Sequence, residues 1–348
     1  FLLSIVLFML VAGLEVDLST VWRQGKPAAV VGLAGTVAPF ALGFAAAWMA
    51  PRWLGYDEGT SRFIFAMFIA TALSISALPV IAKTLMDIGL YYSDLGMIVI
   101  SAAMFSDVVG WILFAIILGL MDVEVAHSGS IGTTVLLVLG FAAAMLTVVR
   151  WAIHRALPWV QAHTSFPGGM LGLAFAIALC SAAFTEWAGV HAIFGAFLAG
   201  VAIGDSPRFR NHTRTIIRQF VSSFFAPLFF ASIGLKVDFL AHFDLPLVLI
   251  AIALACVSKI LACGIAGTAV QMPRREAWAV AFALNARGAM EIILGLLALR
   301  YGVINERLFV ALVVMALVTS VLSGIAIPAV LKHAKRRKIE DFLSSKTY

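Results

Sequence analysis

Charged side chains are scarce in this sequence. Asp, Glu, Lys and Arg make up 12% of its 348 residues, whereas about 25% is usual for a soluble domain. Hydrophobic residues make up 62%, and the mean hydropathy is +1.04. This balance excludes an ordinary soluble domain and predicts a protein whose helices lie in a lipid bilayer.

Cysteine is also rare. Cys180, Cys256 and Cys263 all lie in apolar runs without C-x-x-C spacing, which argues against a disulfide framework and a thiolate metal site. The seven histidines are dispersed without the spacing of metal ligands, and the sequence contains no phosphate-binding loop and no nucleophile motif. We therefore predict that the protein is not an enzyme, needs no cofactor and does not use ATP.

Long apolar runs fill most of the chain. A spanning helix needs about 20 apolar residues, and a run of this length without alternation crosses a bilayer only as a helix, which satisfies its own backbone. We predict an all-α membrane protein with eleven transmembrane helices in this chain. The predicted segments are 1–18, 27–50, 62–86, 95–121, 131–153, 168–187, 190–204, 216–237, 245–270, 277–299 and 306–331.

The basic residues predict an orientation. The net charge of +6 does not indicate a nucleic-acid partner, because the basic residues cluster at alternate ends of the predicted helices. Most of the 24 Lys and Arg residues fall on the side that carries the basic tail 332–348. By the positive-inside rule this side is cytoplasmic, so we expect a multi-pass protein with its C-terminus in the cytoplasm.

An internal repeat relates the two halves of the chain. The stretches "FMLVAGLEVDL" (8–18) and "FFASIGLKVDF" (229–239) share five of eleven positions. They fall on the first and eighth predicted segments, which cross in opposite directions, so the repeat is inverted as in many secondary transporters. Two segments of the second half lack partners in the first. We therefore expect two further helices before Phe1, and thirteen in the native protein.

Two ionisable residues lie deep in predicted spans. Asp107 is near the middle of 95–121, and Lys259 is equally deep in 245–270. Ionisable groups at such depth are costly and usually line an ion or proton pathway. We interpret Asp107 as the ion- and proton-binding group and Lys259 as its charge partner. A structural Asp bonded to backbone, or an ion pair that only joins two helices, is the alternative.

Two segments in matching places of the halves are interrupted. Pro79 removes a backbone donor from one, and Gly288 lies in a polar break of the other. Paired interruptions of this kind point to a transporter's binding site. Arg287 is expected to compensate the carbonyl ends of half-helices or to pair with a glutamate four residues later. The polar residues assigned to the breaks are Thr71, Ser74 and Ser76, and Asn285, Arg287 and Glu291.

The sequence resembles the monovalent cation:proton antiporter-2 family, which includes bacterial sodium and potassium antiporters. The stretches that carry the resemblance are "LFMLVAGLEVDL" (7–18), "SALPVIAKTLMDIGL" (76–90), "SDVVGWILFAI" (106–116), "GAFLAG" (195–200), "PLFFASIGLKVDF" (227–239), "SKIL" (258–261) and "NARGAMEIIL" (285–294). The resemblance implies an inverted-repeat fold with two crossing discontinuous helices, a homodimer, and a bacterial inner membrane as the location.

The resemblance also implies a division of labour along the chain. It implies a scaffold and dimerisation domain (1–22 and 166–242), an ion-transporting core (27–121 and 245–331), a linker helix (131–155) and a cytoplasmic tail (332–348). By motif position Asp107 matches the family's ion-binding Asp, and Lys259 matches its core lysine. Many members carry a second acidic residue before that Asp, but this chain has Ser106. Serine can ligate a cation but cannot neutralise Lys259, so we expect Lys259 to pair with Asp107 itself.

The predicted mechanism is competition between Na+ or K+ and H+ for Asp107, coupled to alternating access. Exchange is electroneutral if Lys259 stays protonated and electrogenic if it releases its proton, and the sequence leaves both open. A sodium-coupled symporter of an organic anion is a second hypothesis, in which Arg287 binds the substrate. A third is a membrane domain that senses ions without transport.

Overall fold

The computed structural model describes residues 2–16, 25–126, 131–164, 168–188, 191–204, 211–235 and 237–344. Its regular elements in these ranges are helices. Parts of two sequence predictions lie outside the described residues, namely positions 17, 18 and 236 of the repeat motifs and positions 345–348 of the tail. The chain divides into two compact units: residues 1–19 with 111–239, and residues 20–110 with 240–348.

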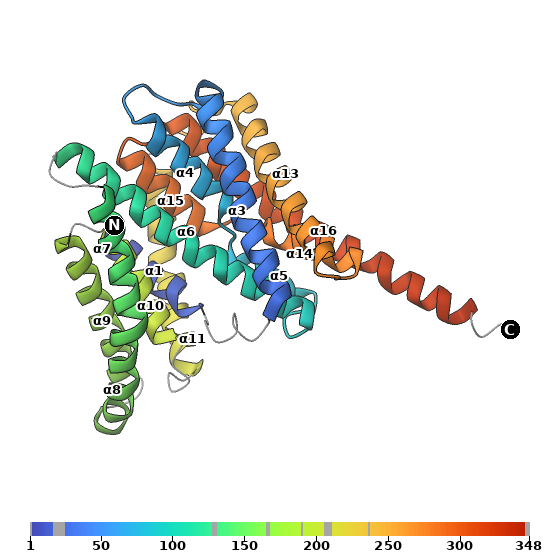
Figure 1. The fold of residues 1–348 in the computed structure, drawn as a ribbon. Helices are drawn as coiled ribbons and strands as arrows, with labels where there is room; N and C mark the ends of the chain where they lie inside the picture. The colour runs from blue at the N-terminus through green and yellow to red at the C-terminus, as the bar shows by residue number, and fades with distance from the viewer. Residues whose placement is uncertain are drawn as a thin grey trace. The chain divides into compact units, whose positions relative to one another are not determined.

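The first unit contains the helices that carry the two repeat motifs, 8–18 and 229–239 (Figure 1). In it α1 packs against α10, and α9 packs against α10. Its helices are α1 (Leu2–Leu14), the part of α6 (Asp94–Ala126) after Gly110, α7 (Ile131–Ala144), η2 (Met145–Val149), α8 (Arg150–His163), α9 (Gly168–Trp187), α10 (Ala192–Gly204), α11 (Asn211–Phe220), η3 (Val221–Phe225) and α12 (Ala226–Gly234).

One predicted helix is longer in the structure. The segment expected to end near residue 153 continues without a break through α7, the π-helical turn η2 and α8 to His163. Hydropathy falls after Arg150 because polar side chains such as His154, Arg155 and Gln161 interrupt the apolar residues there, but helical geometry does not require apolar residues. The polar continuation exposes Trp151 and Trp159, which is typical of a helix end at a membrane interface.

The second unit holds the interrupted helices (Figure 1). Within it α13 packs against α3 and α14, and α16 packs against α14 and α15. Its elements are α3 (Gly25–Met49), η1 (Pro51–Leu54), α4 (Arg62–Ser74), α5 (Leu78–Asp87), α6 through Gly110, α13 (Leu245–Ala269), α14 (Arg274–Leu284), α15 (Ala289–Arg300) and α16 (Glu306–Ser344).

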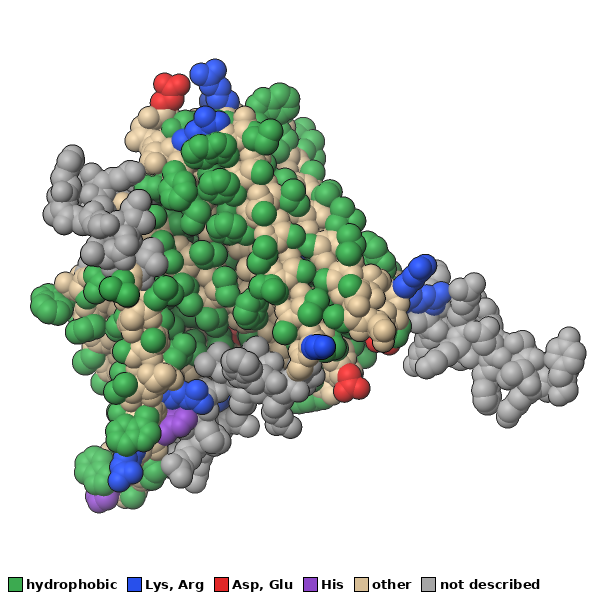
Figure 2. Space-filling view, viewed as in Figure 1, with side chains coloured by type: hydrophobic (Ala, Val, Ile, Leu, Met, Phe, Trp, Pro, Cys, Tyr) green, Lys and Arg blue, Asp and Glu red, His purple; other side chains and the backbone are tan. Residues whose placement is uncertain are grey.

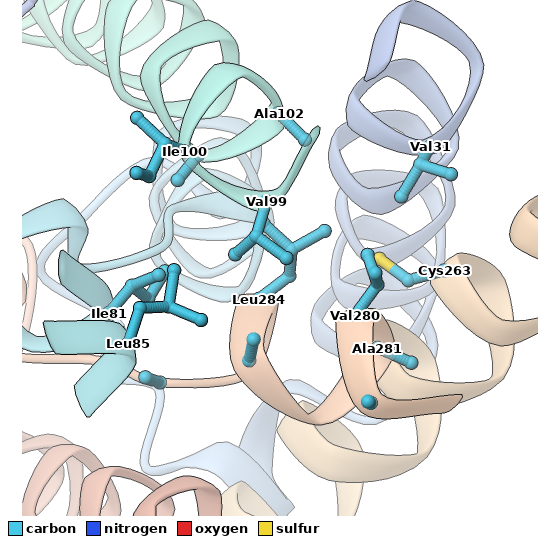
Figure 3. Packing of buried hydrophobic residues seen from close by; sticks show 14 of the residues in the cluster. Val31, Ile81, Leu85, Val99, Ile100, Ala102, Cys263, Val280, Ala281 and Leu284 are labelled. Carbon is cyan, nitrogen blue, oxygen red and sulfur yellow. The ribbon is translucent and has the colours of Figure 1, made fainter. Parts of the chain in front are cut away.

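A hydrophobic cluster joins six of these helices, with Ile327 as the member from α16 (Figure 3). Val31 of α3, Val99 of α6 and Leu284 of α14 are all buried in it. Ile81 of α5 and Cys263 of α13 complete the contact between the two halves of the repeat. The cluster fixes one half of each interrupted helix, α5 and α14, against its neighbours, and therefore fixes the position of the interruptions themselves.

The outer surface of α3 and α13 is apolar. Figure 2 shows hydrophobic side chains over these two helices, and Leu33, Val37, Leu249 and Ile265 are more than a third exposed. A soluble protein rarely exposes a continuous apolar surface of this kind. Within the part of the chain that the structure describes, length and hydropathy identify eight helices able to cross a membrane, or nine with the bent pair α14–α15. Helices α1 and α10 are shorter apolar helices. The structure is that of a multi-pass membrane protein, and eleven spans stays a prediction.

Candidate site at the crossing of two interrupted helices

The two interruptions meet in the interior of the second unit. Ile75–Ala77 is extended between α4 and α5, and residues 285–288 separate α14 from α15 with a bend of 41°. The backbone N–H of Ala77 donates to the carbonyl oxygen of Ala286 at 2.8 Å. Ser76 Oγ donates to the carbonyl oxygen of Leu284 at 2.9 Å. The discontinuous helices therefore cross in direct contact, as the family resemblance implied.

Pro79 begins the second half-helix. It occupies the first turn of α5, where its missing N–H would be unpaired in any helix and its fixed φ favours the start. The proline therefore explains why the chain resumes a helix after Ala77, as well as why it left one.

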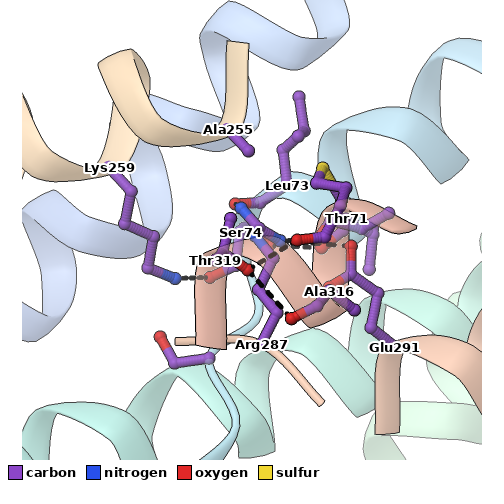
Figure 4. Close-up of polar contacts among 12 residues, drawn as sticks. Thr71, Leu73, Ser74, Ala255, Lys259, Arg287, Glu291, Ala316 and Thr319 are labelled. Carbon is purple, nitrogen blue, oxygen red and sulfur yellow. Dashed lines mark hydrogen bonds and ion pairs between the residues drawn. The ribbon is translucent and has the colours of Figure 1, made fainter. Parts of the chain in front are cut away.

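The carbonyl end of α4 is closed by two cations (Figure 4). The last four carbonyls of a helix have no partner within it, and here they belong to residues 71–74. Arg287 donates through Nη1 to Ala72 O and through Nη2 to Leu73 O, the second at 2.7 Å. Lys259 Nζ donates to Ser74 O. Positive charges thus lie at the end of the helix that carries partial negative charge.

The remaining carbonyl of α4 is satisfied locally. Thr71 O accepts from Ser74 Oγ at 2.8 Å and from the N–H of Ile75. The Thr71 hydroxyl itself bonds one turn back, to Met67 O at 2.9 Å. Ser74 and Ser76 therefore bond carbonyls at helix ends, whereas the Thr71 hydroxyl bonds a carbonyl within α4.

The carbonyl end of α14 is satisfied by neutral groups. Ser323 Oγ of α16 donates to Phe282 O at 2.6 Å, and Ser320 Oγ donates to Arg287 O within the break. Backbone N–H groups of the break bond Ala281 O and Ala283 O. The two crossing ends therefore differ, because two cations close α4 whereas serine hydroxyls and backbone close α14.

Arg287 and Glu291 form a buried ion pair. Nη1 lies 3.3 Å from Glu291 Oε1, and the side chains are 1% and 2% exposed. The sequence offered two roles for Arg287, compensation of carbonyl ends or pairing at i,i+4 spacing. The structure contains both at once, because the guanidinium presents several donors in one plane.

Asn285 lies fully buried in the same break. Its Nδ2 donates to Cys256 Sγ of α13 at 3.3 Å. Its carbonyl oxygen has no hydrogen-bond partner among the described residues. The amide therefore anchors the break to α13 on one side and presents an oxygen on the other.

Asp107 is fully buried on α6. Successive residues of a helix are about 100° apart, so Ala103 and Gly110 project between the directions of Ser106 and Asp107, one turn before and after them. A Cβ built on Gly110 would lie 2.3 Å from Cγ1 of Ile75. The extended segment between α4 and α5 therefore lies against the face of α6 that Ser106 and Asp107 share.

Lys259 differs from expectation in its direct partner. Sequence reasoning paired it with Asp107, whereas its ammonium is hydrogen-bonded to the carbonyl oxygen of Ser74. The charge of Asp107 still acts on it through space, as does that of Glu291. A buried charge needs both a hydrogen bond and a compensating charge, and here the carbonyl supplies the first while Asp107 and Glu291 supply the second from a distance.

Several contacts at the site escaped sequence reasoning. Ser106 Oγ lies 2.9 Å from Thr36 Oγ1 of α3, and both residues are buried. Thr36, Ser320 and Ser323 lie in long apolar runs, where single hydroxyls usually bond their own helix. The spacing of Ser320 and Ser323 on one helix face was the available signal. Among the residues that the structure describes, no group of His, Cys, Asp and Glu could hold a metal ion.

Comparison with known proteins places this chain. Residues 1–333 match the family described as the transmembrane sodium/hydrogen exchanger. The chain belongs to this family. The family consists of transporters, and the resemblance drawn from the sequence motifs is confirmed at this level.

Relatives of this chain come from several kingdoms. Cation/H(+) antiporter 20 of Arabidopsis thaliana is 31% identical over 365 residues, covering 99% of this chain and 42% of that protein. Na(+)/H(+) antiporter NhaS4 of Synechocystis is 29% identical over 326 residues, covering 92% of this chain and 79% of that protein. K(+)/H(+) antiporter 1 of Saccharomyces cerevisiae is 29% identical, covering 91% and 37%. The chain thus spans less than half the length of the plant and yeast proteins.

A solved structure shares the fold of the exchanger-family chain. The sodium proton antiporter MjNhaP1 from Methanocaldococcus jannaschii matches with a TM-score of 0.66 and 14% identity, covering 94% of this chain and 81% of that one. The predicted inverted-repeat antiporter fold is confirmed by this match and by the crossing of the interrupted helices.

Proposed function

We propose that this chain exchanges a monovalent cation, Na+ or K+, for H+ by alternating access. The observation that carries the proposal is the position of Asp107, a fully buried carboxylate on the face of α6 that lies against an unwound helix segment. Transporters bind ions with intramembrane carboxylates at broken helices. The names of the relatives, which include Na+/H+ and K+/H+ antiporters, support both cations as substrates.

The buried charges of the second unit support competition at one site. Asp107, Lys259, Arg287 and Glu291 are each at most 2% exposed, and their charges cancel when all four are ionised. One proton on Asp107, or one monovalent cation beside it, changes the total by the same single positive charge. A carboxylate that accepts either couples the two fluxes, because each ion must leave before the other can bind.

The contact of Lys259 supports an electroneutral exchange. Ser74 O gives the ammonium an acceptor that does not depend on the occupancy of Asp107. Lys259 therefore keeps its proton when a cation arrives, and one cation crosses for one proton. This choice between the two stoichiometries is part of the proposal.

The contacts of Arg287 oppose the symporter hypothesis. That hypothesis requires Arg287 to bind an organic anion, yet both terminal nitrogens are used by Ala72 O, Leu73 O and Glu291, and the side chain is 1% exposed. Withdrawing the arginine would remove the donors of Ala72 O and Leu73 O at the end of α4.

We extend the proposal to the surroundings of the chain. The unit 20–110 with 240–348 acts as the moving ion-transporting core, and the unit 1–19 with 111–239 acts as the scaffold and the site of homodimer contacts. The C-terminus lies in the cytoplasm, and the membrane is the bacterial plasma membrane. The inverted repeat, the exposed apolar helices and the clustering of basic residues support this arrangement.

The test is proton flux in proteoliposomes that contain the purified protein. After an inward Na+ or K+ gradient is imposed, an internal pH dye reports whether protons leave. We expect cation-driven flux in the wild type and none in Asp107→Asn, with Asp57→Asn, an exposed aspartate, as the matched control. Absence of flux in the wild type with both cations would overturn the proposal.

A further inference from the structure

A pair of hydroxyl groups joins α3 to α6 beside Asp107. Thr36 Oγ1 lies 2.9 Å from Ser106 Oγ, and the two residues are 3% and 1% exposed. The contact lies one helical turn after a close approach of the two backbones. One turn earlier, a Cβ built on Gly32 would lie 3.2 Å from Cα of Ala102. Gly32 therefore lets the two backbones approach closely enough for Thr36 to reach Ser106.

The direction of this hydrogen bond follows from counting protons. A hydroxyl has one proton and can accept through its lone pairs. Thr36 Oγ1 donates its proton to Gly32 O at 2.8 Å. In the hydrogen bond between the two hydroxyls, Thr36 is therefore the acceptor. Ser106 is thus the donor. The opposite direction would leave the Ser106 proton without an acceptor among the described residues, because Thr36 Oγ1 is the hydrogen-bond partner that they offer to Ser106 Oγ.

Ser106 bonds across helices, as Ser76 and Ser323 do, and differs in this from three buried threonines. Thr36, Thr71 and Thr319 each donate to a carbonyl of their own helix, which is the usual bond for such a side chain. The Ser106 hydroxyl instead points its proton across to α3. Its lone pairs are then directed away from α3 and remain available.

We propose that Thr36 is a positioning residue that holds Ser106 as an acceptor for the transported cation. The inference rests on the proposed exchange at Asp107. Fixed by Thr36, the Ser106 oxygen supplies a ligand to Na+ or K+ but cannot donate its proton to the Asp107 carboxylate. The same oxygen can also accept the proton of a neutral Asp107 carboxyl, so the effect of Thr36 is on the affinity for the cation and does not exclude the proton.

Removal of the Thr36 hydroxyl frees the proton of Ser106. The Ser106 hydroxyl can then donate to its own helix, at Ala102 O, or to the Asp107 carboxylate. In the second case the Ser106 proton competes with the cation for the lone pairs of the carboxylate. Loss of one buried acceptor of this kind corresponds to about a fivefold change in an equilibrium constant. The change falls on cation binding rather than on the movement of the core.

The experiment measures cation-driven proton flux in proteoliposomes as a function of cation concentration. Thr36→Val removes the hydroxyl at nearly constant volume, and Thr36→Ser keeps it. Thr185→Val is the matched control, because Thr185 is a fully buried threonine that bonds only its own helix, at Ser181 O and Ala182 O. Ser106→Ala removes the other partner. Size-exclusion chromatography in detergent checks that each variant is folded.

We expect Thr36→Val to raise the cation KM about fivefold while the maximal rate changes by less than about twofold. Thr36→Ser should restore the wild-type KM, and Thr185→Val should not alter it. Ser106→Ala should raise the KM by itself, and adding Thr36→Val to it should have no further effect. If Thr36→Val does not fold, Thr36→Ala in its place gives the same comparison.

Three results would overturn the inference. The first is an unchanged KM in Thr36→Val with wild-type exchange intact. The second is a KM that Thr36→Ser fails to restore, and the third is additive effects of the two substitutions. Each of these leaves the proposed exchange standing. Wild-type protein without any exchange refutes the proposed function instead, so the two failures are distinguishable.

Discussion

Replacement of Arg287 by methionine tests whether the crossing is held by charge. The change keeps an unbranched side chain but removes the hydrogen bonds to Ala72 O and Leu73 O and leaves Glu291 buried without its partner. Two charge-assisted hydrogen bonds contribute about 1.5 kcal/mol each. Leaving one member of a buried pair costs about 3 kcal/mol more. We therefore expect the free energy of unfolding to fall by about 6 kcal/mol.

The loss in free energy of unfolding can be measured as a decrease in melting temperature. For a chain of 348 residues, about 6 kcal/mol corresponds to a decrease of about 8 °C. The assay is thermal unfolding in detergent, followed by the fraction that remains monodisperse after heating. The double variant Arg287→Met with Glu291→Gln removes the uncompensated charge, and should lie only about 4 °C below the wild type.

A second ion pair of the same spacing provides the control. Lys83 Nζ lies 2.6 Å from Asp87 Oδ1, but the side chains are 72% and 57% exposed. Exposed pairs contribute at most about 1 kcal/mol, so Lys83→Met should change the melting temperature by less than about 2 °C. The reasoning is refuted if Arg287→Met has the same melting temperature as Lys83→Met. It is also refuted if the double variant melts at a lower temperature than Arg287→Met alone.

Three further predictions concern the site. Gly110→Ala places a Cβ 2.3 Å from Ile75 Cγ1 and should reduce exchange at least about tenfold by displacing the unwound segment, whereas Gly324→Ala, which meets no atom within 4 Å, should transport normally. The rate of wild-type exchange should not depend on an imposed membrane potential, because no net charge crosses. Moving one charge through 100 mV would involve about 2.3 kcal/mol. A rate that changes more than about twofold therefore shows that Lys259 does not keep its proton. Ser106→Asp adds a second carboxylate beside Asp107 and should make the rate voltage-dependent, and an unchanged, insensitive rate contradicts the charge count at this site.

The membrane class and the positions of the breaks followed from local sequence. Hydropathy over about 20 residues decides whether a helix can lie in lipid, so the apolar segments were found without a structure. Pro79 and the polar run at Asn285–Gly288 mark the two interruptions by their own chemistry. The pairing of Arg287 with Glu291 followed from helix spacing alone, and the structure confirms it.

Helix ends were less predictable. The helix expected to stop near residue 153 runs to His163, because a fall in hydropathy marks the boundary of lipid rather than the end of hydrogen bonding. The number of spans and the roles assigned to the two units stay predictions for a related reason. They depend on how helices are placed in the bilayer, and composition does not specify that.

By itself the sequence determined which segments are apolar enough to lie in lipid, where two helices break and which of these segments carry charged residues. Tertiary structure alone decided the partners. Lys259 bonds a carbonyl 185 residues away in the chain, and Thr36 meets Ser106 across 70 residues. Such contacts depend on the crossing of separate helices at close approach, set by Gly32 and Gly110. A carbonyl carries no sequence signature, because every residue has one, so only the fold could show which of them receives the ammonium of Lys259.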